Sequence, residues 1–177
     1  MRYAALLRGV NVGKSVKVPM ASLRSLIENI GFRNVATYLN SGNVIFDSEL
    51  PKREIESSIE ESLAKLIGQK IPVLVKSSSE LDLITNSIPA EWQNDDLQKT
   101  DVAYLFKEAD NEKTLVSLPV RREFPDVRYV EGALFWNVSR KNYNKSQLNK
   151  IIGHVLYEKM TIRNINTARQ LARLTNP

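Results

Sequence analysis

The sequence predicts an α+β fold of two tandem ferredoxin-like repeats, each a split β-α-β unit in the order βαββαβ with an antiparallel sheet. Apolar residues recur at strand and helix spacing in this order through the first 76 residues, and the same order returns after residue 98. The intervening segment is rich in acidic and turn-forming residues. We therefore expect a first subdomain over residues 1–76, an acidic linker with a short helix over residues 77–98, and a second subdomain with a C-terminal helix over residues 99–177.

The first repeat has clear start and stop signals for its helices. Pro19 suits the first turn of a helix, where no N–H is needed, and Gly31 suits the left-handed position past the end. Pro51 and Gly68 bound the second helix in the same way, and Asn40–Asn43 has the composition of a hairpin turn. The expected elements are a strand at 3–8, a helix at 19–29, strands at 35–39 and 44–46, a helix at 51–67 and a strand at 71–75.

The second repeat follows the same order with weaker helix signals. Gly132 separates two β-rich runs as the turn of a hairpin. Residue identity between the two halves is low, so the order of elements alone supports the repeat. The expected elements are a short linker helix at 80–85, a strand at 102–106, a helix at 112–118, strands at 127–130 and 134–138, a helix at 146–155, a strand at 160–162 and a helix at 165–174.

Composition narrows the classes of site. The chain of 177 residues is 42% apolar, which is enough for a packed core. Absence of cysteine excludes disulfides, thiolate nucleophiles and cysteine-ligated metals, and with one histidine a metal site would need carboxylates. We predict no metal and no cofactor. No run approaches the ~20 apolar residues of a membrane helix and the N-terminus lacks a signal-peptide core, so we expect a cytoplasmic protein. The oligomeric state is left open.

Charge is unevenly distributed along the chain. Residues 77–120 carry 3 basic and 9 acidic side chains, whereas residues 121–177 carry 11 basic and 4 acidic ones. From Gly132 onward, Glu158 is the only acid against eight lysines and arginines. Clustered cations attract phosphates, so residues 121–177 suit an anionic partner such as a nucleic acid. The alternative is a basic face that contacts only solvent, which has the same composition.

A loop after the first strand is the main candidate site. It holds Arg8, Gly9, Asn11, Gly13 and Lys14, between an apolar strand and the helix that begins near Pro19. Backbone donors, the helix N-terminus and two cations can together bind one anionic group. A nucleotide-binding P-loop is disfavoured, because it needs four residues between its glycines and three are present.

The split β-α-β topology places a second segment beside this loop. In that topology the turn between the second and third strands lies at the same sheet edge as the end of the first strand. Ser41, Gly42 and Asn43 should therefore converge with Arg8 and Asn11. The alternative is that the loop and the turn are purely structural, since a hairpin turn alone calls for these residue types.

The C-terminal region supplies a second candidate. Arg169 and Arg173 lie four residues apart on one helix face, and with Arg163 they could form a basic ridge. The aromatic residues of the second repeat could stack nucleic-acid bases, as in RNA-recognition domains of the same topology. Core packing is the favoured explanation of those aromatic residues.

Three segments together resemble a known family. They are Leu6–Gly13 with Val18–Met20, Thr37–Val44, and Thr161–Asn164 with Thr167. The chain is similar to members of the bacterial domain-of-unknown-function 1697 family (DUF1697) over nearly its whole length. The resemblance implies the same tandem ferredoxin-like fold and no particular activity. Gly13-Lys14 stands where the family often has two glycines, and Ile165 where an aromatic residue is frequent.

Three hypotheses of function follow. The first is a non-enzymatic binding protein for a phosphate-bearing or nucleic-acid ligand. The second is a small enzyme that acts on an anionic metabolite at the edge formed by Arg8, Asn11, Ser41 and Asn43, without an identified general acid or base. The third is a protein–protein interaction module. The sequence leaves catalysis undecided.

Overall fold

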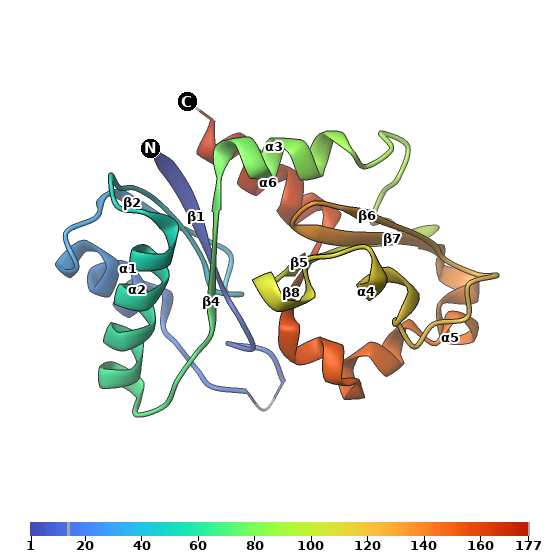
Figure 1. Ribbon diagram of the computed structural model, residues 1–177, viewed down its shortest axis with the longest axis horizontal. Coiled ribbons are helices and arrows are strands. Elements are labelled where there is room, and N and C mark those ends of the chain that lie inside the picture. The colour runs from blue at the N-terminus through green and yellow to red at the C-terminus, as the bar shows by residue number, and fades with distance from the viewer. Residues whose placement is uncertain (14, 177) are drawn as a thin grey trace. The chain divides into compact units, whose positions relative to one another are not determined.

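The computed structural model describes residues 1–13 and 15–176. It has an α+β fold with two four-stranded antiparallel sheets, each in the predicted βαββαβ ferredoxin-like arrangement (Figure 1). The strands are β1 (Arg2–Leu7), β2 (Arg33–Tyr38), β3 (Asn43–Asp47), β4 (Val73–Ser77), β5 (Gln98–Leu105), β6 (Asp126–Val130), β7 (Ala133–Ser139) and β8 (Met160–Asn164). The α-helices are α1 (Met20–Asn29), α2 (Lys52–Ile67), α3 (Ser78–Asn86), α4 (Lys113–Val116), α5 (Tyr143–Ser146) and α6 (Ile165–Thr175). Segments of 3₁₀ helix are Lys107–Ala109, Arg140–Asn142, Leu148–Gly153 and Val155–Lys159.

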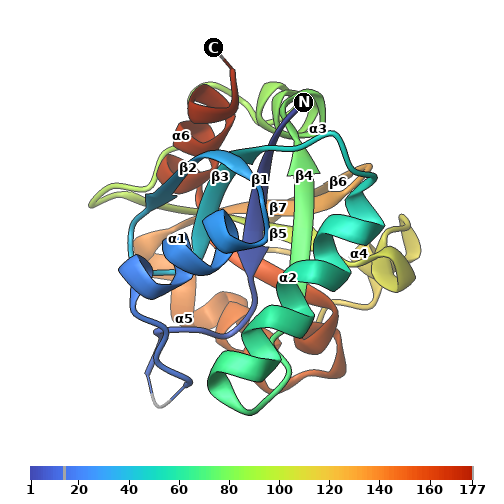
Figure 2. The ribbon, with the colours of Figure 1, turned by 90° about the vertical axis from the view of Figure 1, so that its left-hand side faces the viewer.

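The first sheet has the strand order β2-β3-β1-β4, with Ala4 of β1 opposite Ile45 of β3. Helices α1 and α2 lie over one face of this sheet (Figure 2). Both helices bury one apolar stripe, whose members recur every three or four residues as an amphipathic helix requires. The buried helix residues are Leu23, Ile27, Ile55, Ile59 and Leu63. They pack against alternate residues of the strands, including Ala5, Leu7, Val44, Phe46, Val73 and Val75.

The predicted helix boundaries in this sheet's unit are confirmed. Pro19 and Pro51 are the N-caps of α1 and α2. Gly68 caps the end of α2 with φ 80°, and Gly31 follows α1 with φ 103°. Only glycine adopts such angles without steric cost, so the two residues end the helices as expected.

The second sheet has the order β6-β7-β5-β8. One face packs against the 3₁₀ segments and short helices, which bury Leu148, Ile151 and Leu156. The strand residues of this core are Ala103, Leu105, Leu134, Trp136, Val138 and Met160. The aromatic side chains of the central strands are interior: Tyr104, Phe135 and Trp136 are at most 2% exposed. The prediction that these aromatic residues pack in the core is therefore confirmed.

One predicted helix is wrong. Residues 146–155 do not form a single helix, because Gln147 has a left-handed φ of 60° and the chain continues as separate 3₁₀ segments. Leu148 and Ile151, three residues apart, are buried at 3₁₀ spacing, whereas Ile152 and Val155 are 65% and 64% exposed. The apolar spacing was compatible with both helix types, and the left-handed residue decides between them.

The chain divides into two compact units. The first unit contains Met1–Leu81 and the chain from Leu171 onward, and the second contains Asp82–Gln170. Within the first unit, the Arg2 Nε donates to the Leu174 carbonyl oxygen at 2.9 Å, which ties the end of α6 to β1. The linker helix α3 begins directly after β4 instead of two residues later.

Carboxylates cap the outer edge of the first sheet. The backbone N–H groups of Val73, Val75 and Ser77 on the edge strand β4 donate to Glu60, Glu56 and Glu80, each at 2.9 Å. These three residues are two apart along β4, so they present their amides on the same side of the strand. The carboxylates therefore satisfy donors that an edge strand otherwise leaves unpaired.

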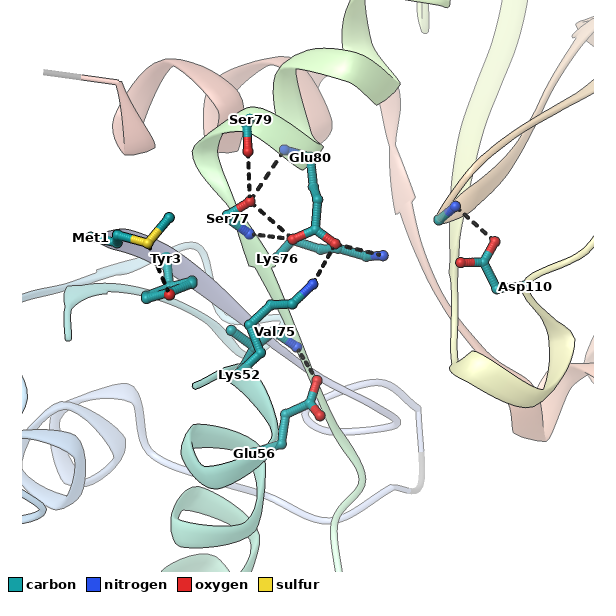
Figure 3. Close-up of polar contacts among 11 residues, drawn as sticks. Met1, Tyr3, Lys52, Glu56, Val75, Lys76, Ser77, Ser79, Glu80 and Asp110 are labelled. Carbon is teal, nitrogen blue, oxygen red and sulfur yellow. Dashed lines mark hydrogen bonds and ion pairs between the residues drawn. The ribbon is translucent and has the colours of Figure 1, made fainter. Parts of the chain in front are cut away.

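Glu80 is the most densely bonded of the three carboxylates (Figure 3). It accepts from Lys52 Nζ at 2.6 Å and from the Ser77 hydroxyl at 3.0 Å, while Lys76 Nζ lies 3.7 Å away. Ser77 Oγ in turn accepts from the Glu80 N–H, which completes a capping box at the start of α3. Burial raises the pKa of Glu80, but the bonds from Lys52 and Ser77 and the charge of Lys76 outweigh burial and lower it overall.

We expect Glu80→Gln to lower the free energy of unfolding at pH 7 by about 1–2 kcal/mol, because charge-assisted hydrogen bonds are lost. A carboxyl group whose folded-state pKa is depressed stabilises the protein above its unfolded pKa, near 4.5, and loses this contribution as the pH falls through the folded value. Urea unfolding at several pH values measures the free energy of unfolding of wild type and variant. The difference between the two should be full at neutral pH and should shrink as the pH falls below 4.5. The exposed Glu61 of α2 gives the control, Glu61→Gln, which should change little; an equal loss in both variants would contradict the assignment.

Candidate functional site

The structure brings the two predicted loop segments together. The Leu7 N–H donates to the Gly42 carbonyl oxygen at 2.9 Å, and the Asn11 Nδ2 donates to the Asn40 carbonyl oxygen at 2.8 Å. The β1–α1 loop and the β2–β3 turn thus meet at one sheet edge, as the topology predicts. Lys14 lies outside the described residues.

Asn11 is held at the centre of this edge by its own side-chain bonds. Its Nδ2 also donates to the Val18 carbonyl oxygen at 2.8 Å, and its Oδ1 accepts from the Val18 N–H at 2.8 Å. The residue has a left-handed φ of 57°, which asparagine tolerates better than most residues. Both ends of the amide are engaged, so Asn11 fixes the loop to the start of α1 and to the neighbouring turn.

Asn43 has a similar role inside the turn. It is fully buried, and its Nδ2 donates to the Tyr38 carbonyl oxygen at 2.9 Å and to the Ser41 hydroxyl at 3.0 Å. A buried amide needs such partners to offset its desolvation. The contacts of Asn43 are therefore those expected if this residue serves only to form the hairpin turn.

The glycine loop itself is closed by short-range bonds. Gly9 and Gly13 have positive φ angles of 64° and 51°. The Asn11 N–H donates to the Val16 carbonyl oxygen, and the Val12 N–H to the Ser15 hydroxyl, both at 2.8 Å. These donors are engaged within the loop and do not point at an open anion site. Ligand binding at this edge stays a prediction.

The three arginines of the predicted C-terminal ridge lie in different environments. Arg163 on β8 is 7% exposed, and its Nη1 donates to the Thr161 hydroxyl at 2.8 Å and to the Ile162 carbonyl oxygen at 2.9 Å. Burial lowers the pKa of Arg163 to about 10, although Tyr104 and Tyr157 act in the opposite direction. Arg169 is half-buried, with its Nη2 3.3 Å from the Pro89 carbonyl oxygen, and Arg173 alone is exposed. The three side chains therefore do not form one exposed ridge.

A different set of cations is exposed in the second unit. Lys141, Lys145 and Lys150 are exposed, and no described residue forms an ion pair or hydrogen bond with their side-chain ammonium groups. The sequence has no acidic residue from Gly132 to Tyr157. We call residues 140–150 the basic segment. The charge asymmetry of the sequence indicates this region, but the choice of individual residues needed their exposure.

Arg140, at the start of the basic segment, has a structural role. Its Nε donates to the Asp95 carbonyl oxygen at 2.6 Å, and its Nη2 lies 3.4 Å from Asn94 Oδ1. Tyr143 is half-buried and lies beneath Lys99, whose Nζ is 5.3 Å from the ring centroid. The surface of the segment is therefore formed by the exposed Arg140, the three lysines and the amide side chains between them.

The described residues offer neither a metal site nor a membrane span. These residues contain no group of three or more histidine and acidic side chains that could hold a metal ion. None of their helices is both long and apolar enough to span a membrane.

Comparison with known proteins identifies the family. The family model described as "Protein of unknown function (DUF1697)" matches residues 1–136. The chain belongs to this family. Comparison with curated proteins finds no match. The match of this DUF1697 member ends before the basic segment, so the segment lies outside the part that the family model covers.

A solved structure extends the comparison over the whole chain. The conserved bacterial protein SP0830 from Streptococcus pneumoniae is 28% identical, with a TM-score of 0.82. The alignment covers 99% of this chain and 98% of that one. The shared fold therefore includes the C-terminal region of this DUF1697 protein.

Gly42 should be the least replaceable turn residue of this site. A Cβ atom at Gly42 would lie 2.5 Å from Val10 Cγ2 and 2.8 Å from Leu7 Cβ, and φ is 73°. We expect Gly42→Ala to lower the free energy of unfolding by about 2–4 kcal/mol, because the turn must move away from β1 and the loop.

Gly31→Ala is the matched control for this experiment. Gly31 also has a positive φ, 103°, but a Cβ there meets nothing within 4 Å. In the same urea titration, Gly31→Ala should lower the free energy of unfolding only by the backbone strain, about 1–2 kcal/mol. Equal losses in the two variants would show that close packing of the turn is unimportant.

Proposed function

We propose that this protein is a non-enzymatic, cytoplasmic nucleic-acid-binding protein that contacts phosphate groups through its basic segment. The observation that supports the proposal is the exposure of Lys141, Lys145 and Lys150 without acidic neighbours along the segment. Exposed ammonium groups without ion-pair partners bind phosphates and release the counterions condensed on a nucleic acid, which provides most sequence-independent affinity.

The first-unit loop is a weaker basis for function. The side-chain amides of Asn11 and Asn43 bond to groups of the loop and of the neighbouring turn, so neither amide is offered to a ligand. This favours the binding hypothesis at the basic segment over an enzyme at the Arg8 edge.

The proposal implies recognition of phosphates instead of bases. Base stacking requires exposed aromatic faces, and the central-strand aromatics Tyr104, Phe135 and Trp136 are buried. We therefore expect similar affinity for single strands of different sequence. Three phosphate contacts predict that log K falls with log salt concentration with a slope of about −2 for a single strand.

We expect the triple variant Lys141→Gln, Lys145→Gln, Lys150→Gln to lose most of its affinity for a fluorescent single-stranded RNA. Its salt dependence should be flatter than that of wild type by about two units of slope, because three phosphate contacts are removed. Fluorescence anisotropy at low and moderate salt measures both quantities.

A second triple variant separates site from net charge. Lys65, Lys107 and Lys113 are also exposed, and their replacement by glutamine changes the net charge by the same amount. This variant should keep wild-type affinity within about twofold, since charges outside the basic segment contribute only through the screened general field. Equal weakening in both triple variants, or no binding by the wild type at low salt, would overturn the proposal.

A further inference from the structure

Strand β6 is an edge strand whose outer side is unprotected. It is the outermost strand of the second sheet, and no described residue outside β7 hydrogen-bonds with its backbone. At the opposite edge of the same sheet, β8 is largely buried, with Met160 at 1% and Thr161 at 3% exposure. An open edge presents free N–H and C=O groups to another strand.

The edges of the first sheet are protected by two different devices. Three glutamates cap β4. On β2 the pairing is interrupted between Arg33 and Ala36, where Asn34 has a φ of 51°. Irregularities of this kind hinder pairing with a further strand. Strand β6 has neither device.

The side chains of β6 divide between the two faces of the sheet. Val127 and Tyr129 pack against the core on one face. Asp126 and Arg128 lie on the other, where their side chains are 51% and 47% exposed and Arg128 Nη2 lies 2.8 Å from Asp126 Oδ2. One face of the strand is therefore apolar, and the other carries one charge of each sign.

A groove lined by apolar residues and by Arg122, Glu123 and Asp126 lies beside the beginning of β6. Its volume is about 720 Å³, and Leu115, Val116, Phe124, Pro125 and Val127 contribute to its lining. Val116 in this lining is 77% exposed, so it offers apolar surface beside the strand. A strand added to β6 would cover part of this surface, as in peptide recognition by strand addition.

We propose that a second copy of this chain pairs with β6, so that two β6 strands lie antiparallel across a twofold axis. Residues 124–130 read Phe-Pro-Asp-Val-Arg-Tyr-Val. With Val127 opposite its symmetry mate, Asp126 faces Arg128 of the other copy, and each charge meets its opposite. In the same register Pro125 faces Tyr129, and Phe124 faces Val130.

Other registers are less favourable. Directly opposite residues in an antiparallel sheet point to the same face, so a twofold pairing must centre on one residue. Centring on Arg128 places like charges opposite each other, and centring on Asp126 or Tyr129 leaves Arg128 opposite an apolar residue. Opposite charges and apolar pairs across strands stabilise a sheet, and like charges destabilise it. Charge complementarity therefore selects the register centred on Val127.

The interface is small, because it consists of a few strand residues and part of the groove. We therefore expect a concentration-dependent dimer with a dissociation constant in the micromolar range, as for other small interfaces. Sedimentation velocity of the full chain from low to high micromolar concentration should show monomer and dimer in exchange. A wild-type protein that stays monomeric throughout this range overturns the proposal.

Charge reversal tests the register itself. Arg128→Glu places a glutamate opposite Asp126 twice in each dimer, so the dissociation constant should rise at least tenfold. The double variant Asp126→Arg, Arg128→Glu restores opposite charges and should recover the dimer. Recovery also shows that the single variant did not fail through loss of the Arg128 contact with Trp92, whose ring centroid is 4.9 Å from the guanidinium carbon.

Arg24→Glu is the matched control. Arg24 is an exposed arginine in a surface ion pair with Glu28, and it lies on α1 of the first unit. This variant should dimerise like the wild type. Dimers of unchanged strength in Arg128→Glu, or failure of the double variant to recover, would overturn pairing through β6. No nucleic acid is present in the experiment, so its outcome is independent of the proposed function.

Discussion

Pairing of backbone N–H and C=O groups at the sheet edges is the constraint on which the rest of this structure depends. Inside each sheet the ladder satisfies these groups, but the outer strands need other partners. The first sheet supplies them with side chains of the same unit. Glu56 and Glu60 of α2 and Glu80 of α3 reach the free amides of β4, so the helices contribute hydrogen bonds as well as apolar burial.

This arrangement couples electrostatics to the fold. Burial and the neighbouring Glu60 raise the pKa of Glu56, although the bond from Val75 and the charges of Lys52 and Lys76 oppose the shift. The pKa of Glu80 is lowered instead, since two lysines and Ser77 surround its carboxylate. Two carboxylates that cap the same strand therefore differ in their response to acid. The difference follows from how many donors each one meets.

The loops at the other end of the first sheet illustrate why polar residues in turns are ambiguous signals. Asn11, Ser41 and Asn43 are the residue types that a small anionic ligand would need, and also those that tight turns need. Their hydrogen bonds close the loop and join it to the neighbouring turn. In the second unit the side chains of the three lysines of the basic segment bond to none of the described residues, so their charge is directed to solvent.

The order of elements, the family and the helix ends at Pro19, Gly31, Pro51 and Gly68 could be read from the sequence, because apolar spacing and backbone restrictions act locally. Local pattern also indicated that the loop at Asn11 and the turn at Asn43 meet. The exposure of individual side chains could not be predicted from these local patterns. The same basic composition gives the buried Arg163 and the exposed Lys145, and the same apolar spacing gives the buried Ile151 and the exposed Val155. Burial and hydrogen-bond partners depend on which distant segments pack against a residue, and only the tertiary structure decides that.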